Sequence, residues 1–466
     1  MSSEVDDTPL ARAAIRLAAW FEHWFPDAFS FAILTVAVVY LLGCAIGNPP
    51  MKMALFFGEG FWKLIEFTMQ MVMIIVSGYA LATAPPIHRV IVRMASVPKT
   101  PRGAVAYIAL FSMLSSLLSW SFSLIFSGLL AREVAHRVKG TDYRAAGAAA
   151  YMGLGSVWAL GLSSSAAILM ATNAPARADL FKVSGIIPYS ETIFSWQSMV
   201  MAVVLIIASM IVAYVSAPRP ENARDAESLG VSIAEAEAPR EEAATPAERM
   251  DRHPVLTLCI VLVGGLYMID VLRAGGPGAL TELPNYILLF LLLGLLLHWS
   301  PKSFTQAVVK SAPACAGVLL QYPLYAGAAR MITESGISHH LSEFFVAHST
   351  HSTFPLLVGV YSAVLGLFVP SAGGKWLIEA PYLMGAANQL QCNLGWVVQT
   401  YNAAEALPNL IHPFWMLPLL GILHLRARDI VGYSAVQFIV HVPLVMLLVW
   451  ALNLTMPYIP PIPPPS

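Results

Sequence analysis

Long apolar segments recur along the whole sequence, and their length limits the possible folds more than any other feature. A helix needs roughly 20 apolar residues to cross a hydrocarbon core of about 30 Å. Segments close to this length lie at 29–46, 62–84, 145–172, 194–216, 254–272, 284–299, 312–333, 396–424 and 432–454. Hydrophobic residues make up 57% of the 466 residues and charged residues only 11%. We therefore expect an all-α polytopic membrane protein.

Two further apolar segments, 104–131 and 356–382, are each broken in the middle, the first at "SWSFS" and the second at "PSAGGK". Lipid cannot satisfy the backbone groups at such a break, so the break must be buried in protein or line a cavity. We expect both segments to be re-entrant helical hairpins. With both hairpins returning to the side they entered, most Lys and Arg residues between spans fall on one side, which predicts a cytoplasmic N-terminus.

The two halves of the sequence match each other at an offset near 250 residues. "SLLSWSFSLIF" at 116–126 corresponds to "GLFVPSAGGKW" at 366–376, and "WALGLSSSAAILM" at 158–170 corresponds to "ALPNLIHPFWMLP" at 406–418. One extra span between the halves would give them opposite orientations. Inverted repeats with broken helices near the membrane midplane are typical of secondary transporters, and two closed tips suit alternating access better than an open channel.

This pattern divides the chain into consecutive parts. Between the halves lies an Ala/Glu/Pro/Arg-rich stretch without a fixed apolar face, which is typical of a flexible linker. The expected parts are a cytoplasmic N-terminal segment (1–28), a first inverted repeat (29–216), a flexible cytoplasmic linker (217–253), a connecting transmembrane helix (254–272), a second inverted repeat (284–454) and a proline-rich tail (455–466).

The expected tip of the second hairpin contains the residue whose burial in the membrane costs the most free energy. A charge within the membrane costs several kcal/mol unless it is paired or hydrated, so Lys375 is a candidate for binding an anion. Alternatively, Lys375 reaches the outer interface along Trp376 or pairs with Glu379, one turn further on. The glycines of this tip allow a ligand close to the backbone. The predicted substrate contacts here are Pro370, Ser371, Gly373, Gly374, Lys375 and Trp376.

Serine-rich breaks in the first half provide further candidate ligands for a carboxylate. Hydroxyls clustered in broken membrane helices can bind a solute, although each can instead bond to its own backbone or allow close helix packing. The predicted contacts are Ser119, Trp120, Ser121, Ser163, Ser164 and Ser165.

A polar stripe runs along the span that follows the second hairpin. Its residues recur at steps of three and four, as on one face of a helix. Burial favours the neutral form of a carboxyl group, so Glu405 is the candidate proton carrier, or a sodium ligand if sodium is the coupling ion. A structural pairing of Glu405 with Lys375 is the alternative. We assign Glu405, Asn402 and His412 to ion coupling and Asn409 to substrate binding.

Other binding classes find little support in the sequence. The four cysteines stand singly and show no metal-ligand spacing, and a net charge of −1 does not suggest a nucleic-acid partner. No catalytic pair appears, so we expect neither an enzyme nor a cofactor other than the coupling ion. The expected partners are a small anion and membrane lipid, and a homo-oligomer is compatible with the sequence.

Several stretches in the same order resemble the short-chain fatty acid transporter family, which includes bacterial acetoacetate and butyrate permeases. They are "GEGFWKL", "MQMVMIIVSG", "AREVAHRV", "QYPLYAG", "PSAGGKW", the segment from Glu405 to Trp415, and "RDIVGY". The family tip reads more like P-S-G-G-G-x-W, so Ala372 departs from it, and Lys375 fills its variable place.

The resemblance implies import of small monocarboxylates across a bacterial inner membrane, together with an elevator-type ion-transporter fold. Proton symport is the expected coupling. Sodium coupling, a dicarboxylate or lactate carrier on the same fold, and a channel remain alternatives. A dicarboxylate carrier would need a second fixed cation near the tips, where only Lys375 is found.

Overall fold

The computed structural model describes residues 28–461 except 64, 172–180, 182, 232–244, 277–278, 281–282, 338–339, 341–342, 345–346, 369–371 and 413. Within this part the chain is all-helical and has no β-strand. Five of its helices are long and apolar enough to cross a membrane, and a sixth span results if the bent pair Thr68–Ala82 and Pro85–Met94 counts as one. The predicted all-α fold with several apolar helices is therefore confirmed.

The helices of the first half are α2 (Ala28–Ala45), α3 (Pro50–Phe61), α4 (Ile65–Ala82), α5 (Pro85–Met94), α6 (Pro101–Leu118), α7 (Trp120–Arg137), α8 (Tyr143–Met152), α9 (Ser165–Ala171) and α11 (Trp196–Ser216). Those that follow are α12 (Pro246–Arg252), α13 (Pro254–Gly275), α14 (Leu283–His298), α15 (Pro301–Glu334), α17 (Phe354–Phe368), α18 (Ala372–Gln389), α19 (Leu394–Asn409), α20 (Leu417–Leu423) and α21 (Ala427–Asn453).

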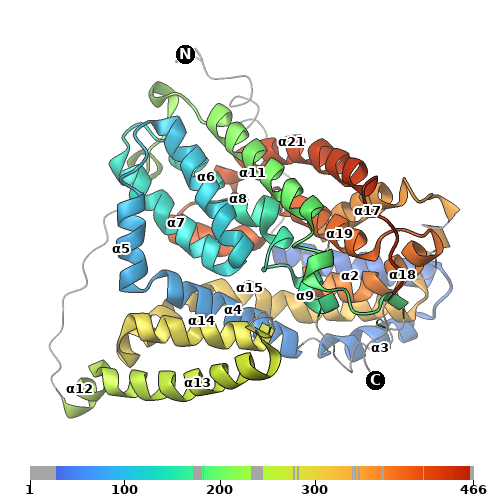
Figure 1. The fold of residues 1–466 in the computed structure, drawn as a ribbon, viewed down its shortest axis with the longest axis horizontal. Helices are drawn as coiled ribbons and strands as arrows, with labels where there is room; N and C mark the ends of the chain where they lie inside the picture. The colour runs from blue at the N-terminus through green and yellow to red at the C-terminus, as the bar shows by residue number, and fades with distance from the viewer. Residues whose placement is uncertain are drawn as a thin grey trace.

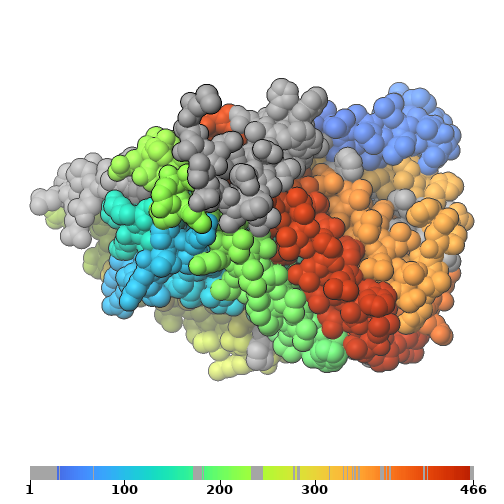
Figure 2. Space-filling model, turned by 90° about the horizontal axis from the view of Figure 1, so that it is seen from above, coloured from blue at the N-terminus to red at the C-terminus, as the bar shows by residue number. Residues whose placement is uncertain are grey.

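The helices form two groups that lie one above the other in Figure 1. In the lower group, α2, α3, α4 and α14 pack around the long helix α15, and α13 packs on α14. In the upper group, α6, α7, α8 and α11 pack together, α21 packs on α8 and α11, and α17 and α19 pack on α21 and on each other. Figure 2 shows α21, in red, running along α11, in green. Contacts of α4 with α7 and of α15 with α18 and α20 join the two groups.

The first broken segment forms two packed helices, α6 and α7, separated by a single extended residue. Ser119 has φ −153° and ψ 116°, which ends α6, and its hydroxyl accepts a hydrogen bond from Phe122 N (3.3 Å) as the N-cap of α7. The tip can lie close to α4 because Gly78 has no side chain: a Cβ there would lie 2.5 Å from Ser121 Oγ. The break predicted from "SWSFS" therefore falls at Ser119.

The following helix is interrupted as well. After α8 the chain forms one π-helical turn (Gly153–Val157) and a short 3₁₀ turn (Trp158–Leu160), and it resumes a regular helix at Ser165. Backbone passes close to both flanking glycines, since a Cβ on Gly153 or on Gly161 would lie 2.3 Å from a carbonyl oxygen of α6. Glycine is therefore required where this interrupted helix crosses the first hairpin.

The second half has a comparable order of elements. A helix pair, α17 and α18, is followed by α19, which ends at Asn409, and by the shorter helix α20 and the closing helix α21. Every residue of α19 is buried, which places its polar stripe in the interior of the upper group. The internal repeat and the opposite orientation of the two halves stay predictions.

Some elements differ from the predictions. The sequence did not predict the short helices α3 and α5; α5 is bent by 67° from α4 and begins at Pro85, a residue that favours a new helix start. The first part of the 217–253 segment packs on the protein: Arg102 Nε donates to Ala217 O (3.0 Å), Arg224 N donates to Asp142 Oδ2 (3.0 Å), and Val231 is buried. The N-terminal segment lies almost wholly outside the described residues.

Candidate functional site

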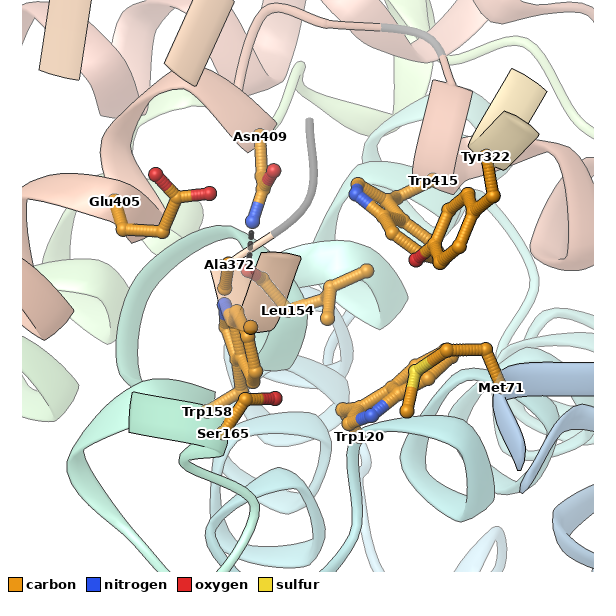
Figure 3. Close-up of a pocket in the computed structure, with 11 residues that line it drawn as sticks. Met71, Trp120, Leu154, Trp158, Ser165, Tyr322, Ala372, Glu405, Asn409 and Trp415 are labelled. Atoms are coloured by element: carbon orange, nitrogen blue, oxygen red, sulfur yellow. Dashed lines mark hydrogen bonds between the residues drawn. The ribbon is translucent and has the colours of Figure 1, made fainter. Parts of the chain in front are cut away.

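A cavity lies between the helix pair α6 and α7, the interrupted helix after α8, α19 and the lower group of helices. Its walls are Met71, Trp120, Leu154, Trp158, Ser165, Tyr322, Ala372, Gly373, Glu405, Asn409 and Trp415. Figure 3 shows the carboxylate of Glu405 and the amide of Asn409 on one side, and the rings of Trp415, Tyr322 and Trp120 on the opposite side. The cavity is therefore amphipathic: its polar wall, which also contains the Trp158 ring, faces an aromatic wall.

The aromatic wall is assembled from three distant parts of the chain. Trp415 makes edge contacts with Trp120 of α7 at 5.3 Å between ring centroids and with Tyr322 of α15 at 6.4 Å. Such pairs contribute about 0.5–1.5 kcal/mol each beyond the area they bury. The cavity is small, with a volume of about 20 Å³. A single water needs roughly 10–15 Å³, so a larger solute requires the walls to move apart.

Glu405 connects the cavity to a fully buried cluster of charges. Its carboxylate lines the cavity and forms an ion pair with the Lys375 ammonium, which is 1% exposed. Lys375 Nζ also donates to Ser362 O (2.8 Å) and lies 4.9 Å from the centre of the Tyr401 ring. Among the described lining residues no side chain is basic, so the ammonium lies behind Glu405 and not at the cavity surface.

Glu379 is the second carboxylate of this cluster. Its Oε1 lies 3.8 Å from Lys375 Nζ, and its Oε2 accepts a hydrogen bond from Ser362 Oγ (3.2 Å). The side chain is completely buried, and Oε1 has no hydrogen-bond partner. The sequence suggested Glu379 only as an alternative partner of Lys375, one turn away; the structure places both carboxylates of the cluster at the same ammonium.

The other predicted contacts of the second tip have different surroundings. Pro370 and Ser371 lie outside the described residues. Gly373 lines the cavity at the start of α18, whereas Gly374 follows within the helix. Trp376 is fully buried and packs on Tyr401 with ring centroids 4.5 Å apart. It therefore supports the charge cluster from behind rather than facing the cavity.

The serines predicted as ligands are mainly engaged with the backbone. Ser119 caps α7, Ser163 Oγ accepts from Trp120 N (2.7 Å), and Ser164 Oγ accepts from Ala167 N (3.1 Å) at the start of α9. Ser121 Oγ lies 3.3 Å from Ser119 Oγ. Of the six residues predicted in these breaks, Ser165 and Trp120 line the cavity.

The polar residues predicted along and after α19 have different surroundings. Asn409 lines the cavity and donates from Nδ2 to Leu154 O (3.3 Å). Asn402 Nδ2 donates instead to Gln399 Oε1 (2.6 Å), one turn back on the helix, and Gln399 bonds Ser198 of α11. His412 is buried beyond the end of α19 and is not among the described lining residues. The structure therefore brings Glu405 and Asn409, but not Asn402 or His412, to the cavity.

Several lining residues were not predicted from the sequence: Met71, Leu154, Trp158, Tyr322, Ala372 and Trp415. Met71 and Tyr322 each follow a glutamine, Gln70 or Gln321, in "MQMVMIIVSG" and "QYPLYAG", two of the stretches that resemble the family. A polar glutamine within an apolar span was therefore a signal next to both positions. The position of Trp415 depends on the turn after α19, whose geometry hydropathy does not specify.

Comparison with solved structures identifies the fold. The chain has 16% identity and a TM-score of 0.51 with the YdaH transporter of Alcanivorax borkumensis, whose topology is described as unusual, over 95% of this chain and 97% of that one. It has 12% identity and a TM-score of 0.50 with MtrF of Neisseria gonorrhoeae, over 93% of this chain and 97% of that one. The structure of MtrF is described as illuminating a class of antimetabolite efflux pumps. At these identities the likeness shows the fold alone, an all-helical fold that this chain shares with both proteins.

Sequence comparison identifies the family. The model of the short chain fatty acid transporter family matches residues 9–452. A relative from Escherichia coli (strain K12), provisionally named a short-chain fatty acid transporter, is 33% identical over 91% of this chain and 96% of its own length. A relative from Haemophilus influenzae with the same provisional name is 32% identical over 93% and 98%. The chain belongs to the short-chain fatty acid transporter family, a family of transporters and not of enzymes.

Proposed function

We propose that the protein imports a short-chain monocarboxylate together with a proton. The observation that supports this most directly is the amphipathic cavity, whose polar wall of Glu405, Asn409 and Ser165 faces an aromatic wall. A molecule with one carboxyl group and a short alkyl chain matches both walls. Acetoacetate, butyrate and similar acids have this form.

The charge of Glu405 explains why a second ion must accompany the substrate. An anion entering the cavity meets this carboxylate, and the Lys375 ammonium behind it is already paired with it. Like charges at close range in a buried site are costly unless one is neutralised. A proton taken up by the cluster removes one negative charge, so substrate anion and proton bind more strongly together than either does alone.

The order of elements supports an alternating-access cycle. In this proposal the halves 29–216 and 284–454 are inverted repeats, and the hairpin tips at 104–131 and 356–382 approach the substrate from opposite sides. The upper group of helices would carry the site past the lower group in an elevator movement. The protein would lie in a bacterial inner membrane with its N-terminus in the cytoplasm.

Uptake into proteoliposomes tests this proposal. We expect labelled butyrate or acetoacetate to accumulate when the lumen is more alkaline, but not when only a sodium gradient is imposed. Protein-free liposomes measure passive permeation of the protonated acids. Glu405→Gln should lower the uptake by at least about tenfold, equivalent to 1.4 kcal/mol, whereas the exposed linker variant Glu227→Gln should match the parent.

Two results would contradict the proposal. Absence of protein-dependent uptake for acetate, butyrate and acetoacetate would exclude the substrate class. Uptake that follows a sodium gradient and ignores the pH gradient would favour the sodium-coupled alternative.

A further inference from the structure

The ammonium of Lys375 lies among groups that would suit a monovalent metal cation. Ser362 O of α17 lies at 2.8 Å, the carboxylate of Glu405 of α19 forms an ion pair, and Glu379 Oε1 lies at 3.8 Å. The Tyr401 ring lies below at 4.9 Å. Carboxylates and main-chain carbonyls from neighbouring membrane helices are the usual sodium ligands in secondary transporters. A side-chain cation attached to the protein occupies this position here.

The cluster contains one positive group and two acidic groups, so the fully ionised form has one excess negative charge. This excess is unequally shared. Glu405 Oε2 contacts the ammonium directly, whereas Glu379 is fully buried and its Oε1 lies 3.8 Å from the ammonium; neither oxygen has a further hydrogen-bond partner. An unpaired buried carboxylate oxygen is costly. A proton bound to Glu379 would remove the excess charge where it is least compensated.

Among the described residues that surround Glu379, no positive group other than Lys375 is present to do this. α15 and α9 also pack on α18; α15 brings Tyr322 to its start, and α9 has the sequence SAAILMA, without a titratable residue. The titratable groups that interact with Glu379 come from α17, α18 and α19 and are Tyr361, Lys375, Tyr382, Tyr401 and Glu405.

We propose that Glu379 holds the coupled proton and that the Lys375 ammonium replaces a sodium ion in the coupling site. This inference rests on the proposed function, because a coupling site has meaning only in a symporter. It keeps the proton as the coupling ion but assigns it to Glu379, which is not among the described lining residues, instead of Glu405, the carrier expected from the sequence, which lines the cavity. Protonation adds one proton to the Glu379 carboxylate from one side of the membrane, and deprotonation returns it to the other side.

Counting charges gives a stoichiometry. The empty cluster has one ammonium and two carboxylates, a net charge of −1. With a proton on Glu379 and a bound monocarboxylate anion, the net charge of the loaded site is again −1. Loaded and empty carriers then cross the membrane with the same charge, so one proton accompanies each anion and net transport is electroneutral.

Binding of radioactive sodium to the purified protein tests the ammonium's role without any substrate. The parent should show no saturable ²²Na⁺ binding. Lys375→Ala should acquire saturable binding, and the added change Glu379→Gln should weaken it by at least about tenfold, equivalent to 1.4 kcal/mol. Saturable binding to the parent that Glu379→Gln abolishes would overturn the proposal, as would a Lys375→Ala protein that elutes as one folded species and binds none.

Transport by the Glu379→Gln variant tests whether Glu379 binds the coupled proton. The loaded variant would have a net charge of −1 and the empty variant none, so its uptake should ignore the pH gradient and instead follow an inside-positive potential set with potassium and valinomycin. Uptake driven by the pH gradient to the parent's level would overturn the assignment. If the variant transports nothing, ²²Na⁺ binding alone decides. Failure of the parent protein to transport any monocarboxylate would contradict the proposed function. The ²²Na⁺ binding results and the transport results of Glu379→Gln concern only the coupling site.

Discussion

Replacing Lys375 by methionine should destabilise the protein strongly, because it leaves two buried carboxylates without their cation. Lys375 is 1% exposed, and the side chains of Glu379 and Glu405 are 0% and 3% exposed. Removing one partner of a buried ion pair costs about 3–5 kcal/mol. At about 2.1 cal/mol/K of unfolding entropy per residue, 466 residues give about 1 kcal/mol/K, so the apparent Tm should fall by about 3–5 °C.

Thermal unfolding of the detergent-purified protein, followed by size-exclusion chromatography of heated samples, measures this shift. The double variant Lys375→Met/Glu405→Gln restores the net charge of the cluster and should recover at least half of the loss. Lys99→Met, at an exposed lysine, should leave Tm within about 0.5 °C, since surface changes cost little. A Lys375→Met protein as stable as this control would refute the buried cluster.

Three further predictions concern transport. Gly366→Ala should reduce uptake several-fold, because its Cβ would lie 3.0 Å from Glu405 Oε2 and 2.9 Å from Pro408 Cγ. Gly385→Ala, with open space around its Cβ, should not reduce uptake. Equal uptake rates for the two variants would contradict the tight packing of the cluster. Trp415→Ala should raise the half-saturation concentration of butyrate about 3–10-fold through the loss of aromatic contacts. It should also let six- to eight-carbon acids compete with labelled butyrate for uptake. Trp450→Ala, on the exposed side of α21, is the control, and an unaltered chain-length preference would exclude Trp415 from the site. Protein-dependent uptake should rise by up to about tenfold as the external pH falls from about 7 to 6, because protonation of the cluster accompanies binding; a flat profile after subtraction of passive permeation would argue against proton coupling.

The sequence predicted the residues of the candidate site unevenly, and the reason is the range of the interactions. Glu405 and Asn409 could be found because a polar residue in an apolar span is costly and therefore conspicuous. The serines were equally conspicuous, but hydroxyls can bond to nearby backbone as well as to a ligand. Ser119 and Ser164 cap helices, whereas Ser165, next in sequence, lines the cavity.

By itself the sequence determined that the chain forms apolar helices, where several of them break, and to which family it belongs. These features depend on local composition: the length of an apolar run, a proline or glycine, and matching stretches in order. Only the tertiary structure decided that Lys375 on α18 meets Glu405 on α19 and Ser362 on α17, that Glu379 shares the same ammonium, and that Trp415 closes the cavity opposite Glu405. Those contacts depend on how each helix is rotated and placed against its neighbours, which packing of the whole molecule sets and hydropathy does not encode.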